Sequence, residues 1–147
     1  MNEITDPAGN VFKWKEIDHP DYKYEVIEDY SVKLHFDTGE FIMSKYFILS
    51  ADGWLTIKSG YRWDGASGPT IDTISTMRAS AIHDAIYQMI RERLLSMDYK
   101  ELGDRELNIV MQEDYHPTNW FERWWSGFRA GYYEQAVGMF GWVALRT

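Results

Sequence analysis

A chain of 147 residues is long enough to bury a sizeable core, and we expect a single domain over residues 1–147. Its 23 acidic and 15 basic side chains give a formal net charge of −8, which argues against nonspecific nucleic-acid binding because such binding needs Lys and Arg to neutralise phosphates. The lack of cysteine excludes disulfide bonds, thiolate metal ligands and a cysteine nucleophile.

The first part of the chain has the alternating apolar pattern of β-strands. An extended stretch begins at Tyr24, and the segments 31–36 and 41–49 predict a hairpin around a turn at residues 37–40. A further turn at Asp52 and Gly53 precedes a strand over residues 54–57. We therefore expect one small antiparallel sheet within residues 22–62.

The spacing of apolar residues then becomes helical. It predicts a first helix over residues 74–95 and a second over residues 100–114. Pro117 ends any helix before it, and a third helix is expected over residues 120–139. Strands followed by helices in one undivided chain are typical of an α+β fold, with the sheet in the N-terminal half and three helices after it.

The loop between the last strand and the first helix carries chemically informative side chains. Residues 60–69 contain three glycines and a proline, which predict a sharply folded backbone. Asp64 and Ser67 are the side chains of this loop that can form hydrogen bonds at short range. The loop is thus one half of a candidate site.

The first predicted helix supplies the other half. Ser80, His83 and Tyr87 are spaced three and four residues apart and share one stripe, with Asp84 on its shoulder. A polar stripe of this kind interrupts an otherwise apolar helix face. Because only about 15–20 residues separate it from Asp64, contact costs little closure entropy, and we expect the loop and the stripe to form one polar cluster.

The loop and helix together resemble a family catalogued as domain of unknown function 1353, which is common in bacteriophages and prophages. The resemblance covers about residues 40–111 and includes a later helical Asp104 and, more loosely, an aromatic-Gly-aromatic segment at residues 140–142. Gly68 departs from the family pattern, in which an aliphatic residue usually precedes the proline. The residues that carry the resemblance are Gly60, Tyr61, Asp64, Gly65, Ala66, Ser67, Pro69, His83, Asp84 and Tyr87.

The resemblance implies a phage-encoded protein that resides in the cytoplasm of the bacterial host or is incorporated into a virion. The family has no established activity to carry over. A function therefore has to be inferred from the side chains themselves, and three interpretations of the cluster stay open.

The first interpretation is a metal-assisted hydrolase. One imidazole and three carboxylates would suit Zn²⁺, Mn²⁺ or Fe better than Ca²⁺, and the ligands would be Asp64, His83, Asp84 and Asp104. A divalent metal would lower the pKa of a bound water toward ~7, with a spare carboxylate as general base. The His-Asp pair is also similar to the HD phosphohydrolases, but those enzymes need an additional upstream histidine on a helix, and His19 and His35 precede the first predicted helix.

The second interpretation is nucleophilic catalysis by Ser67, with His83 as base and Asp64 or Asp84 orienting it. No strand immediately precedes Ser67 to present it as a nucleophile elbow does. The third interpretation is a noncatalytic polar network that locks the loop against the helix. The candidate catalytic residues under the first two are Asp64, Ser67, His83, Asp84 and Tyr87.

The segment Trp120–Tyr133 is rich in aromatic residues. One helix cannot turn all of them toward a single core, and interfaces are enriched in Trp, Tyr and Arg. We expect this segment to be the contact surface of a homo-oligomer or the docking site of a phage or host protein. The alternative is that the N-terminal segment with Phe12 and Trp14 folds back and covers these rings within one chain.

No apolar run approaches the ~18 residues of a membrane span and the N-terminus lacks a signal peptide, so no membrane partner is expected.

Overall fold

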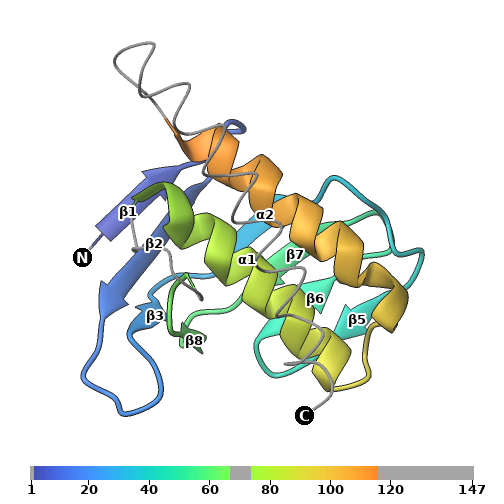
Figure 1. Ribbon diagram of the computed structural model, residues 1–147, viewed down its shortest axis with the longest axis horizontal. Helices are drawn as coiled ribbons and strands as arrows, with labels where there is room; N and C mark the ends of the chain where they lie inside the picture. Colours follow the sequence, from blue (N-terminus) through green and yellow to red (C-terminus); the bar gives the residue numbers. More distant parts are fainter. Residues whose placement is uncertain (1, 67–73, 116–147) are drawn as a thin grey trace. The chain divides into compact units, whose positions relative to one another are not determined.

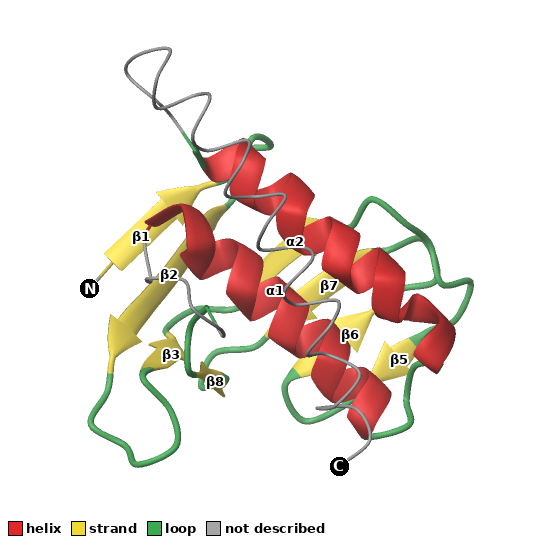
Figure 2. Ribbon diagram, viewed as in Figure 1, coloured by secondary structure: helices red, strands yellow, loops and turns green. Residues whose placement is uncertain are grey.

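The structure of the chain is a computed structural model that describes residues 2–66 and 74–115 (Figure 1). The chain divides into two units, Met1–Gly65 and Ala66–Thr147, and each is described by itself. The fold is α+β, as predicted, with strands in the first unit and helices in the second (Figure 2). The expected third helix over residues 120–139 lies outside the described residues, and the single domain over residues 1–147 stays a prediction.

The described part of the first unit contains two four-stranded antiparallel sheets, ordered β1-β2-β3-β8 and β4-β7-β6-β5. The prediction of one sheet within residues 22–62 is therefore wrong: there are two sheets, and the strands begin at Asn2. The strand bounds are β1 Asn2–Thr5, β2 Val11–Glu16, β3 Tyr24–Val26, β4 Tyr30–Lys33, β5 Ile42–Met43, β6 Phe47–Leu49, β7 Trp54–Ile57 and β8 Arg62–Trp63.

An aspartate turn produces the two strands that the sequence pattern did not reveal. Asp6 Oδ1 accepts hydrogen bonds from the backbone N–H groups of Ala8 (3.0 Å) and Asn10 (2.9 Å). Its other oxygen accepts a 2.6 Å bond from the hydroxyl of Tyr30 on β4. The turn thereby joins β1 to β2 and ties the first sheet to the second.

The predicted hairpin of residues 31–36 and 41–49 is also wrong. β4 pairs with β7, placing Val32 opposite Leu55. Residues 41–49 instead contain a hairpin of their own, in which β5 pairs with β6. Ser44 holds that tight turn, because its backbone N–H donates to Phe47 O (2.8 Å) and its hydroxyl accepts from Phe47 N–H (3.2 Å). The expected strand over residues 54–57 is confirmed as β7.

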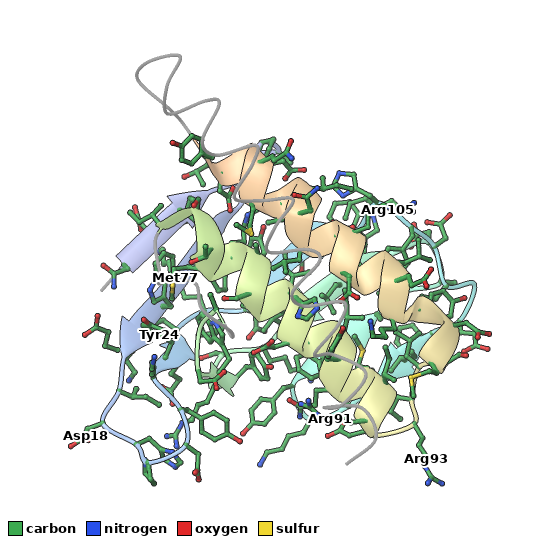
Figure 3. All side chains as sticks on the ribbon, viewed as in Figure 1. Asp18, Tyr24, Met77, Arg91, Arg93 and Arg105 are labelled. Atoms are coloured by element: carbon green, nitrogen blue, oxygen red, sulfur yellow. The ribbon has the colours of Figure 1, made fainter. Side chains whose placement is uncertain are left out.

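Aromatic side chains form much of the core of the first unit. The ring of Phe12 lies 5.4 Å from that of Trp14, 5.2 Å from that of Tyr30 and 5.8 Å from that of Trp63, measured between centroids. All four are buried. Since β2 and β8 belong to one sheet and β4 to the other, this group packs the two sheets together. Outside the core, Asp18 lies in the loop that joins β2 and β3 (Figure 3).

The described part of the second unit consists of α1 (Ile74–Arg91), a short 3₁₀ helix (Met97–Tyr99) and α2 (Lys100–Asp114). The two α-helices lie side by side and antiparallel (Figure 1). Gly103 allows their close approach, since a Cβ there would lie 3.0 Å from Ile86 Cγ2. The bounds of α2 match the predicted ones, and the two helices bring together residues that are far apart in the sequence.

The first helix ends at Arg91 rather than at the predicted residue 95. Arg93 adopts a left-handed conformation with φ of 62°. Its N–H donates to Ile90 O (3.0 Å), and the N–H of Leu94 donates to Met89 O (2.9 Å). These two bonds form a Schellman motif, which ends the helix by satisfying its last carbonyl groups. The side chain of Arg93 points away from both helices (Figure 3).

Candidate functional site

The carboxylate of Asp104 on α2 is the centre of a buried polar cluster. Oδ1 lies 2.9 Å from His83 Nε2 and accepts a 2.6 Å hydrogen bond from the hydroxyl of Tyr87. Oδ2 accepts a 2.9 Å bond from the ammonium of Lys100, one helical turn earlier on α2. We call these four residues the Asp104 cluster: His83, Tyr87, Lys100 and Asp104.

The local sequence explains how the helices place these groups. His83 and Tyr87 are four residues apart on α1, so they lie on one face, and their ring centroids are 4.1 Å apart. Lys100 and Asp104 have the same spacing on α2. Antiparallel packing of the two helices then brings the two pairs together.

All four side chains are removed from solvent. None of the four residues exposes more than 5% of its surface. A charge buried to this degree is tolerated when it is paired and hydrogen-bonded. Both oxygens of Asp104 have partners, so the cluster meets this condition.

The cluster changes the proton affinity of its members. Burial acts most strongly on the pKa of His83 and lowers it, but the hydrogen bond to Asp104 and the neighbouring Asp84 carboxylate together raise that pKa above its ordinary value. Burial acts to raise the pKa of Asp104, yet hydrogen bonds from His83, Tyr87 and Lys100 outweigh it and lower that pKa. The pKa of Tyr87 is raised, first by burial and then by its bond to Asp104. Relative to the same groups in water, the cluster thus favours the anionic form of Asp104, the protonated form of His83 and the neutral form of Tyr87.

Asp84 lies next to the cluster rather than within it. Its Oδ1 is 3.6 Å from His83 Nδ1, and its side chain is 27% exposed. At this distance the contact is electrostatic and too long for a hydrogen bond. Asp84 therefore helps to stabilise a positive charge on His83 from the partly exposed side.

The structure brings together some of the predicted site residues. His83, Tyr87 and Asp104 meet directly, with Asp84 beside them. Asp64 is exposed and belongs to the first unit, so its expected contact with His83 stays a prediction. Ser67 lies outside the described residues. Ser80, which shares the stripe in the sequence pattern, donates its hydroxyl to Met77 O on its own helix (3.1 Å).

The four predicted metal ligands are divided between the two units, with Asp64 in the first and His83, Asp84 and Asp104 in the second, so a site formed by all four stays a prediction. Within residues 2–66 and 74–115, no group of three or more His, Cys, Asp or Glu side chains is arranged to hold a metal ion. Both carboxylate oxygens of Asp104 are already hydrogen-bonded, Oδ1 to His83 and Tyr87 and Oδ2 to the ammonium of Lys100, and this arrangement disfavours a metal ion there.

A second polar cluster lies near the other end of the helix pair and was missed by sequence reasoning. The guanidinium of Arg78 binds Asp114 through Nε to Oδ2 (2.9 Å) and through Nη2 to Oδ1 (3.0 Å). Nη2 also donates to Glu113 Oε2 (2.8 Å). Arg78 is completely buried and Asp114 nearly so. We call these three residues the Arg78 cluster.

Two sequence signals could have revealed the missed residues. Arg78 precedes Ile82 by four positions and so heads an apolar row of α1, where a charge requires a buried anionic partner. Lys100 precedes Asp104 by four positions, the spacing of a helical ion pair. Neither signal identifies the residue of the other helix that completes the cluster, which is Asp114 for Arg78 and His83 for Asp104.

Comparison with protein-family models, with curated proteins and with solved structures gives no match for this chain. The resemblance described above thus rests on the loop and helix residues alone. A search of the described helices finds none that is both long and apolar enough to cross a membrane.

Proposed function

We propose that this chain is a noncatalytic protein in which the Asp104 cluster is a structural network that fixes α1 against α2. One observation carries the proposal: the Asp104 carboxylate accepts bonds on both oxygens from three buried donors, namely His83, Tyr87 and Lys100. A buried network with every member satisfied rigidifies a core and specifies one packing arrangement.

Burial and charge both favour this assignment over catalysis. A general base must reach the proton that it abstracts, and none of the four residues exposes more than 5% of its surface. Lys100 places a positive charge 2.9 Å from Asp104 Oδ2, where it competes with any cation for the carboxylate. The Arg78 cluster adds a second buried tie between the same helices. Two buried ion-pair clusters between the same two helices support a structural role more than a catalytic one.

A metal-assisted hydrolase is the second candidate function. The observation that favours it is the position of His83, which lies 2.9 Å from Asp104 and 3.6 Å from Asp84. These three groups, with Asp64, are the proposed ligands of a divalent metal, and the substrate would be a cell-wall or nucleotide bond. Lys100 would then have to give up its bond to Asp104 before Oδ2 could bind the metal.

Metal analysis of protein purified without chelators separates the two candidates. For a structural network we expect no stoichiometric transition metal, and we expect His83→Ala to lower the melting temperature while chelators leave it unchanged. A stoichiometric metal that is lost in His83→Ala would overturn the proposal and favour the hydrolase. Glu101→Gln, an exposed change on α2, serves as the matched control for both measurements.

The biological setting is a proposal from sequence resemblance. The family likeness supports a phage accessory or virion component in the cytoplasm of a bacterial host. The aromatic segment Trp120–Tyr133 supports docking of a second copy or of another phage or host protein. Light scattering tests self-association, for which we expect a mass above 17.3 kDa that Trp125→Ala reduces. A concentration-independent 17.3 kDa particle would contradict the homo-oligomer.

A further inference from the structure

We draw no further inference here: the strongest candidate, the apolar surface patch formed by the exposed side chains of Phe41, Met43 and Trp54 on and beside β5 and β7, carries nothing because nothing in the described structure shows what covers it.

Discussion

His83 and Asp104 are joined by a 2.9 Å contact between Nε2 and Oδ1, although they lie 21 positions apart and on different helices. A carboxylate only accepts hydrogen bonds, so the imidazole nitrogen must carry the shared proton. Tyr87 and Lys100 complete the environment of the same carboxylate. Through this contact, Asp104 on α2 is bonded to α1 and helps to hold the two helices together.

Replacing Asp104 with Asn should strongly destabilise the protein. The substitution keeps the size of the side chain but removes the negative charge that lies 2.9 Å from the buried ammonium of Lys100. Breaking a buried pair by removing one partner costs about 3–5 kcal/mol. Urea denaturation followed by circular dichroism should show this loss of unfolding free energy.

An exposed acidic residue on the same helix provides the control. Glu101→Gln removes a charge in the first turn of α2, where the helix dipole contributes at most about 1 kcal/mol. If Asp104→Asn costs no more than Glu101→Gln, Asp104 is not the centre of a stabilising network.

Sequence patterns predicted the helices better than the sheets because helical contacts are local. The interval of three or four residues that defines α2 lies within the segment itself, and its predicted bounds agree with the structure. Strand pairing, in contrast, joins distant residues, as between Val32 on β4 and Leu55 on β7. The alternating pattern found individual strands, but it contained no information about their partners.

The candidate site shows the same difference between local contacts, which the sequence pattern predicted, and contacts between distant residues, which it did not. Its titratable groups on α1 stood out because they interrupt an apolar face. Lys100 and Asp104 pair within α2, but the contact of Asp104 with His83 depended on how α2 packs against α1, and the Arg78 cluster depended on the same packing. Helix α1 ends early because Arg93 adopts a left-handed conformation, for which glycine is the usual residue. Since position 93 is not a glycine, the sequence did not predict this helix end.

The contribution of His83 to the stability of the protein should fall as the pH rises above about 6.5. The pKa of His83 is raised in the folded state, so its protonation stabilises the fold fully below the unfolded value of about 6.5. That contribution is lost as the pH rises through the folded pKa. Asp104, whose folded pKa is lowered, loses its contribution only in acid. Unfolding free energies from urea titrations between about pH 6 and pH 9 should show the decline.

The difference between wild type and His83→Gln isolates the histidine from other titrating groups. We expect this difference to shrink with rising pH, because His83 is the group whose folded-state pKa is raised. A His83→Gln difference that is flat or grows with pH would contradict the assigned direction.

Arg78→Met should destabilise the protein by about 3–5 kcal/mol, because it removes the guanidinium that pairs with the buried carboxylate of Asp114. The double variant Arg78→Met, Asp114→Leu should recover part of that loss, since both charges of the close pair are then gone. A double-mutant cycle based on urea unfolding measures the coupling directly.

Arg105→Met tests whether loss of any arginine on these helices has a similar effect. Arg105 lies on α2 and is exposed, so the change should alter stability by no more than about 0.5 kcal/mol (Figure 3). Additive effects of Arg78→Met and Asp114→Leu would show that the Arg78 cluster does not act as a unit.

Gly53→Ala should destabilise the first unit more than Gly9→Ala does. Both glycines have positive φ, 91° and 93°, so a side chain introduces a similar backbone strain of about 1–3 kcal/mol at either position. A Cβ at Gly53 would also lie 2.5 Å from the backbone oxygen of Phe36, whereas one at Gly9 would meet no atom within 4 Å. Because Leu34 N–H donates to Gly53 O (2.8 Å), the two segments cannot separate without weakening their pairing. Urea unfolding should place Gly53→Ala at least about 1 kcal/mol below Gly9→Ala, a difference due to the steric contact alone. Equal losses would mean that the turn at Gly53 relaxes freely and that backbone strain accounts for both.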